Sequence, residues 1–378
     1  MYSRLPSVGT TIFTVMSKLA AEVGAINLSQ GFPDFDCDPA LIDAVVRHLR
    51  AGHNQYAPMP GVLGLRQAIA AKYQHYHGRA YEPDTEITVT SGATEAIFDA
   101  VAALVHPGDE VIVLDPCYDS YVPAILLNGG VPVVVPMRLP AYEIEWDAVR
   151  AAITGRTRLL MINSPNNPTG SILTASDIWA LTSIVRDTGI FVISDEAYDQ
   201  IIFDGERHES LARHPELASR AFVIGSFGKT YHVTGWKVGY AVAPAPLTTE
   251  LRKVHQFVTF STFTAVQYAI AEFLAVRRGL DALPAFYQRK RDLFLRLMEG
   301  SRFRPLACRG TYFQLMDYSH ISDRSDAEFA IWLTREHGVA SIPTSSMLHG
   351  SAAPRVVRFC FAKRDETLER AAERLRRV

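Results

Sequence analysis

Short apolar runs alternate with helix-length segments between residues 86 and 244. The runs are EITVT (86–90), EVIVLD (110–115), TRLLMIN (157–163), FVISD (191–195), AFVIGS (221–226) and VGYAVA (238–243). A run that is apolar at nearly every position suits a strand buried on both faces, and helix-length spacers suit parallel crossovers. The pattern therefore predicts an α/β fold with a largely parallel sheet covered by helices.

The pattern changes after about residue 284. A charged helix is expected over PAFYQRKRDLFLRLMEG (284–300), and a second one over RDETLERAAERLRRV (364–378). Two strands are expected between these helices, at GTYFQLMDY (310–318) and RVVRFCFAK (355–363). These elements predict a smaller α+β domain. The acidic residues of the last helix favour a solvated amphipathic face over a nucleic-acid surface.

Composition narrows the function classes. The 378 residues carry a formal net charge of −2, which argues against nucleic acid as a partner. Four cysteines lie far apart, so neither a disulfide framework nor a zinc or other metal site is expected. The N-terminal apolar run is ended by Lys18 and Glu22, and neither a signal peptide nor a membrane span is expected. We expect a cytoplasmic protein.

Lys229 stands three residues after the run AFVIGS, where a buried strand ends. A lysine there could grip a phosphate, pair with a buried acid or form an imine with a carbonyl compound. A P-loop requires glycine five positions before Gly228, and Val223 stands there. No GxGxxG follows a predicted strand either, so the dinucleotide fingerprint is also excluded.

Other strand ends support the imine. INSPNNPTG (162–170) and SDEAYD (194–199) place Asn, Asp and Tyr side chains where a parallel sheet presents its ligands. TSGATEA (90–96) starts a helix with small residues, whose free N–H groups suit a phosphate. Taken singly, each stretch is more simply a cap or a turn. Together they form the set of groups that pyridoxal 5′-phosphate requires.

Six stretches resemble the class I aminotransferases of pyridoxal-phosphate fold type I, most closely the methionine and kynurenine aminotransferase branch. They are LSQGFPDFD, NQYAPMPG, SPNNPTG, SDEAYD, SFGKTYHVTGWKVGY and RFCFAK. The resemblance runs from about Thr11 to the C-terminus. It implies a large cofactor-binding domain (36–280) with a mostly parallel seven-stranded sheet, a small α+β domain (281–378), and an N-terminal segment (1–35) contributing to the small domain and the active site.

The resemblance also implies a role for each matching residue. Lys229 would hold the cofactor covalently and shuttle the proton, and Arg358 would take the substrate carboxylate. Lys237 stands where much of the wider class has arginine, so its phosphate contact lacks the bidentate fork. The other cofactor contacts implied are Asp195 at the pyridinium nitrogen, Tyr198 and Asn167 at the phenolic oxygen, Tyr118 stacked on the ring, and Gly92, Ala93, Ser226 and a neighbouring subunit's Tyr56 at the phosphate. Substrate contacts are implied for Gly31, Asn167, Phe13, Tyr56 and Phe260.

The expected function is transfer of the amino group of an L-amino acid, with methionine or an aromatic residue preferred, to a 2-oxo acid in a ping-pong cycle. The expected assembly is a homodimer with shared active sites. A β-lyase acting on cysteine S-conjugates and an aspartate-type aminotransferase remain alternatives. A transcription regulator would need a DNA-binding module, for which about thirty residues before GFPDF are too few. A sugar aminotransferase would not need Arg358.

Overall fold

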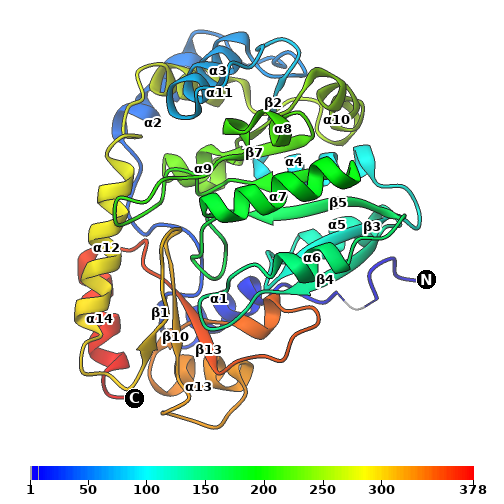
Figure 1. Cartoon of the computed structure of the whole chain (residues 1–378). Helices are drawn as coiled ribbons and strands as arrows, with labels where there is room; N and C mark the ends of the chain where they lie inside the picture. The colour runs from blue at the N-terminus through cyan, green and yellow to red at the C-terminus, as the bar shows by residue number, and fades with distance from the viewer. Residues whose placement is uncertain (1, 7) are drawn as a thin grey trace.

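A seven-stranded sheet forms the centre of the computed structural model, which describes residues 2–6 and 8–378 (Figure 1). β8 is antiparallel to its neighbours β2 and β7, and the remaining neighbouring pairs are parallel. The predicted fold class is confirmed. In spatial order the strands are β2 (Ile87–Thr90), β8 (Gly239–Val242), β7 (Ala221–Ser226), β6 (Phe191–Asp195), β5 (Thr157–Asn163), β3 (Glu110–Asp115) and β4 (Val131–Pro136).

Consecutive residues of the central strands enter different hydrophobic clusters on the two faces of the sheet. In β5, Leu159 and Met161 join one cluster, whereas Leu160 and Ile162 join the other. This alternation follows from the two-residue period of a strand, and it explains why the runs are apolar throughout. One face packs on α4 (Gly92–Leu104), α5 (Tyr121–Leu127) and α10 (Ala245–Val258), and the other on α3 (Leu63–His77), α7 (Ala175–Thr188) and α11 (Thr264–Ala275).

The strand β4 is absent from the apolar runs used for the prediction. Its sequence, VPVVVP, contains two prolines, which lack the N–H group that a central strand needs. β4 pairs with β3 alone and lies at the edge of the sheet, where proline is tolerated. The remaining helices of this part are α2 (Pro39–Arg50), α6 (Trp146–Ala151), α8 (Pro215–Ala218) and α9 (Phe227–Thr230).

A second sheet lies beyond the first and has more elements than predicted. Its order is β12 (Ile342–Pro343), β13 (Val356–Cys360), β10 (Phe313–Asp317) and β9 (Arg304–Pro305), all antiparallel. The two predicted strands are β10 and β13, and the two predicted helices are α12 (Leu283–Leu297) and α14 (Asp365–Leu375). The short strands β9 and β12 and the helix α13 (Asp326–Glu336) are additional.

The N-terminal segment packs with this second part. α1 (Ile12–Glu22) supplies Met16 and Leu19 to the same buried cluster as residues of α13 and β13. The short strand β1 (Ile26–Asn27) pairs in parallel with β11 (Val339–Ala340). Figure 1 shows α1, in blue, beside α13 and below the large sheet. The domain boundaries given above stay a prediction. Among the described residues, no helix combines the length and apolar character needed to cross a bilayer.

Candidate active site

A cavity of about 360 Å³ lies at the edge of the large sheet where the parallel strands end. Asn163, Asp195 and Ser226 are the last residues of β5, β6 and β7, and all three line the cavity. β8 runs in the opposite direction, so it starts at this edge, two residues after Lys237. The topology therefore brings residues from distant parts of the chain to one space.

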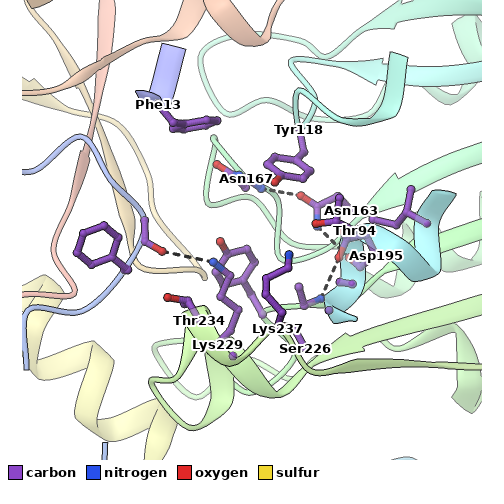
Figure 2. Close-up of a pocket in the computed structure, with 18 of the residues that line it drawn as sticks. Phe13, Thr94, Tyr118, Asn163, Asn167, Asp195, Ser226, Lys229, Thr234 and Lys237 are labelled. Atoms are coloured by element: carbon purple, nitrogen blue, oxygen red, sulfur yellow. Dashed lines mark hydrogen bonds between the residues drawn. The ribbon is translucent and has the colours of Figure 1, made fainter. Parts of the chain in front are cut away.

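Both cavity lysines come from the short connection between β7 and β8. Figure 2 shows Lys229 and Lys237 extending from this segment into the cavity, with Phe13, Tyr118 and Asn167 on the opposite side. Lys229 Nζ donates to the carbonyl oxygen of Gly31 at 3.3 Å. Burial, which disfavours the charged ammonium, lowers the pKa of Lys229 from an ordinary value near 10.5 to about 8. The amine is thereby prepared to act as a nucleophile and base near neutral pH.

The first turn of α4 and Lys237 lie close together at the cavity wall and form an anion recess. Gly92 begins α4 with φ of +74°, and a Cβ added there would lie 3.2 Å from Lys237 Nζ. A Cβ at Gly239 would lie 2.6 Å from the backbone nitrogen of Ala93. Glycine at 92 leaves room beside the Lys237 ammonium group, and glycine at 239 lets β8 approach the first turn of α4 closely. Free N–H groups and a nearby cation suit a phosphate.

Asp195 is held by hydrogen bonds on both carboxylate oxygens. Tyr121 Oη donates to Oδ2 at 2.6 Å, and the backbone nitrogen of Ala197 donates to Oδ1 at 3.1 Å. Burial raises the pKa of Asp195, and these two hydrogen bonds oppose the shift. A buried carboxylate of this kind favours a cationic partner, such as a protonated ring nitrogen.

Arg358 is 1% exposed and reaches the cavity from β13. Its Nη1 donates to Asn167 Oδ1 at 2.6 Å, and its Nη2 donates to the carbonyl oxygen of Ser29 at 2.9 Å. Its Nε has no hydrogen-bond partner among the described residues. The guanidinium lies 3.8 Å from the ring centroid of Phe313. Burial lowers the pKa of Arg358 to about 10, which leaves it cationic at neutral pH and able to bind a carboxylate.

Two of the sequence-predicted site residues lie outside this cavity in the single chain. Tyr56 is 85% exposed and Phe260 is 42% exposed, and their rings meet edge to face with centroids 5.6 Å apart. Phe260 has φ of +67°, a strained conformation for a bulky residue. The others line the cavity together: Phe13, Gly31, Gly92, Ala93, Tyr118, Asn167, Asp195, Tyr198, Ser226, Lys229, Lys237 and Arg358.

Comparison with known proteins identifies the family. A family model described as aminotransferase class I and II matches residues 23–375. The chain belongs to the class I and II aminotransferases. Methionine aminotransferase of Escherichia coli is 50% identical over 377 residues, which cover 100% of this chain and 98% of that protein. Kynurenine–oxoglutarate transaminase of Dictyostelium discoideum is 34% identical, over 98% of this chain and 94% of that protein.

A solved structure agrees with these sequence matches. An Escherichia coli crystal structure for which a methionine aminotransferase function was identified is 49% identical and has a TM-score of 0.98. The match covers 100% of the aminotransferase described here and 99% of the other chain. The predicted resemblance is therefore confirmed, and so is aminotransferase activity as the function. The family depends on pyridoxal 5′-phosphate.

Sequence reasoning missed several residues that shape the site of this aminotransferase. Asn163 ends β5 beside Asp195; its Nδ2 donates to the Asp195 carbonyl oxygen at 2.9 Å, and its Oδ1 accepts from the Asn167 backbone nitrogen at 2.7 Å. A polar residue at the end of TRLLMIN could have signalled this. Tyr121 lies on α5, and Tyr312 Oη donates a hydrogen bond to the carbonyl oxygen of Gly31 at 2.6 Å. Nothing in the sequence around either tyrosine indicates a role in the site.

Proposed function

We propose that this aminotransferase binds pyridoxal 5′-phosphate in the cavity and transfers the amino group of an L-amino acid, methionine above all, to a 2-oxo acid. The observation that carries the proposal is the meeting of three groups around one space. These are the Lys229 amine, the Asp195 carboxylate and the Arg358 guanidinium. The anion recess at Gly92 and Lys237 fits the phosphate of the same cofactor.

When bound, pyridoxal 5′-phosphate supplies a ring that accepts the electrons left at the α-carbon of the amino acid. Lys229 would hold the cofactor covalently and, once displaced by the substrate amine, would take the α-proton on Nζ and deliver it to the carbon that had carried the aldehyde. Asp195 stabilises a protonated ring nitrogen, and Tyr121 keeps the carboxylate oriented. Arg358 binds the substrate carboxylate through its Nε, which has no other partner among the described residues. Its two Nη atoms can also donate to the carboxylate in place of Asn167 Oδ1 and the carbonyl oxygen of Ser29.

The character of the cavity wall supports a thioether or aromatic side chain. Phe13, Tyr118 and Phe313 are among its lining residues, and sulfur–aromatic contacts contribute roughly 0.3–1.5 kcal/mol. The cations lining the cavity of the described chain are Lys229, Lys237 and Arg358, and the proposal gives each a task. A second carboxylate, as in aspartate, would be buried without a cation of its own, which is costly. The named Escherichia coli relative supports the same preference.

The exposed pair of Tyr56 and Phe260 supports a homodimer with shared active sites. Exposed apolar side chains that gather in one patch mark a surface that another molecule covers. Phe257, 86% exposed, and Phe263, 52% exposed, lie three residues before and three residues after Phe260 in the chain. We propose that Tyr56 reaches the phosphate of a partner subunit and that Phe260 reaches the substrate side of that partner's cavity. A cytoplasmic location fits the four cysteines, all described and all free.

A half-reaction screen tests the function. Each amino acid is added to the cofactor-loaded enzyme without an oxo acid, and the conversion of the cofactor to its aminated form is followed by absorbance. Methionine is expected to exceed aspartate in kcat/KM by about tenfold or more, equivalent to roughly 1.4 kcal/mol. Aspartate reacting as well as methionine would contradict the proposed preference.

Borohydride reduction and peptide mapping test the attachment site. The cofactor adduct is expected on Lys229. An adduct on Lys237 instead, or no adduct at all, would contradict the assigned role. Lys229→Ala is expected to abolish turnover, because it removes both the attachment point and the base.

A further inference from the structure

A buried charged cluster lies behind the anion recess, and none of its residues lines the cavity. It consists of Glu95 and Asp99 on α4 and His255 on α10. His255 Nδ1 lies 2.8 Å from Glu95 Oε1 and 3.6 Å from Asp99 Oδ2. His255 and Asp99 are 0% exposed. Neither carboxylate oxygen of Asp99 has a hydrogen-bond partner among the described residues.

The contacts of His255 determine its protonation. Nε2 lies 3.0 Å from the carbonyl oxygen of Met59, and a carbonyl can only accept a hydrogen bond. Nδ1 faces the Glu95 carboxylate, which also accepts when ionised. Both ring nitrogens therefore donate, and the ring is an imidazolium. Burial by itself would lower the pKa of His255, but the neighbouring Asp99 and Glu95 carboxylates outweigh it and raise the pKa to about 9.

Glu95 connects this cluster to the recess. Its Oε2 accepts a hydrogen bond from the backbone nitrogen of Ser91, the N-cap residue of α4. Gly92, the next residue, forms the recess with Lys237. The side chain of Glu95 therefore holds the turn that presents the N–H groups to the phosphate. An ionised carboxylate at this place would also repel that phosphate unless a cation balanced it.

The same histidine anchors the two loops that bear the exposed aromatic pair. Its side chain binds Met59, three residues after Tyr56 in the loop NQYAPMPG. Its backbone carbonyl oxygen accepts hydrogen bonds from Thr259, at 3.1 Å, and from Phe260, at 2.9 Å. His255 therefore contacts Glu95, which holds the first turn of α4, and it also forms hydrogen bonds to the two loops that carry Tyr56 and Phe260.

We propose that His255 is a positioning residue for the cofactor phosphate: its imidazolium neutralises Glu95, so that α4 can be capped by a carboxylate and still receive a phosphate dianion at its first turn. The proposal rests on the proposed use of pyridoxal 5′-phosphate. Loss of His255 should weaken binding of the phosphorylated cofactor more than binding of pyridoxal, which has the same ring and aldehyde but no phosphate.

The test is a cofactor titration of the cofactor-free protein, followed by absorbance, with pyridoxal 5′-phosphate and with pyridoxal. His255→Gln is compared with wild type and with His77→Gln. His77 is another buried histidine on a helix, and its ring nitrogens have no hydrogen-bond partner among the described residues. The Kd for pyridoxal 5′-phosphate is expected to rise about tenfold or more in His255→Gln, the effect of losing one compensating charge in a partly buried site. The Kd for pyridoxal should stay within about twofold, because it lacks the phosphate that the uncompensated charge repels.

A double variant separates charge from general damage. Adding Glu95→Gln to His255→Gln removes the Glu95 carboxylate but keeps an oxygen that can accept from Ser91 N–H. The second carboxyl, Asp99, has a pKa that burial raises to about 6, so it is readily neutralised by a proton once the imidazolium is gone. The double variant should recover to within about threefold of wild type, because the repulsive charge is gone. A role limited to folding predicts no such recovery.

Three results would overturn the proposal. Equal losses of affinity for pyridoxal 5′-phosphate and pyridoxal would show a general structural effect. An unchanged Kd in His255→Gln would show that the cluster does not act on the recess. A wild-type protein that loses affinity after treatment with a chelator, and regains it with a divalent cation, would show that the three side chains bind a metal instead. Failure of wild type itself to capture pyridoxal 5′-phosphate would refute the proposed function, a different outcome.

Discussion

The lowered pKa of Lys229 predicts how fast the cofactor-free protein captures its cofactor at different pH values. Attack on an aldehyde requires the neutral amine, so the capture rate follows the neutral fraction of Lys229. With a pKa of about 8, that fraction is about 9% at pH 7 and about 91% at pH 9. The capture rate should therefore rise about tenfold over this interval and level off near pH 9.

An ordinary lysine would behave differently over the same interval. With a pKa near 10.5, its neutral fraction rises about a hundredfold between pH 7 and pH 9 and does not level off. At pH 7 its neutral fraction is about 0.03%, roughly 300-fold below that of Lys229. The two cases thus differ in both the steepness of the rise and the presence of a plateau.

The assay is stopped-flow absorbance after mixing the cofactor-free protein with pyridoxal 5′-phosphate between pH 6.5 and 9.5. Nα-acetyl-lysine amide, an unburied amine, reacts with the same cofactor in parallel. Its rate divided by its expected neutral fraction at each pH gives the pH dependence that belongs to the cofactor alone. The rate measured for the protein is then divided by this factor. Lys229→Met should show no fast phase. A corrected rate that climbs through pH 9.5 without a plateau would refute the argument that burial activates this amine.

Three further changes test other parts of the site. Phe13→Ala should shrink the preference for methionine over aspartate, measured as kcat/KM in the half-reaction, while the cofactor spectrum stays unchanged; an intact preference would mean that Phe13 packs the N-terminal segment without touching substrate. Tyr121→Phe removes the hydrogen bond to Asp195 and, in steady-state assays, should lower kcat about tenfold while KM changes little, because a hydrogen bond to a charged group is of this strength. A kcat equal to that of wild type would contradict this role of Tyr121. Mixing inactive Lys229→Ala and inactive Tyr56→Phe subunits should regenerate activity through hybrid sites, whereas a fully active monomer in a sizing column would exclude shared sites.

Residues beside buried strands were the most predictable from sequence. Asp195 ends one largely apolar run and Lys229 stands shortly after another, and a parallel sheet brings the ends of such runs to one edge. The resemblance added Arg358, which lies in the middle of the apolar strand β13 and which no periodicity would have singled out. Prolines hid β4, because its sequence lacks the donors expected of a central strand.

Residues that act through a second element left no local signal. Tyr121 follows the expected stacking residue by three positions, yet its contact with Asp195 depends on how α5 packs. His255 reads as one more polar position on the amphipathic helix α10, and its role depends on α4. Tyr56 and Phe260 have roles that a single chain does not complete, and their assignment stays a prediction.

The parallel pairing of β1 with β11 has a consequence for the order in which the protein can be completed during synthesis. Ile26 pairs with Val339, and Leu28 accepts a hydrogen bond from Cys360, so the segment before the large sheet is joined to strands that the ribosome makes almost last. Until α13 and those strands emerge, Met16 and Leu19 lack much of the cluster that buries them, and Phe13 has no Arg358 to face. Contacts between such distant parts of a chain form slowly, and the unpaired apolar segment is exposed to aggregation in the meantime. A nascent chain halted before residue 339 should therefore hold most of the large sheet while its N-terminal segment stays open to proteases and chaperones.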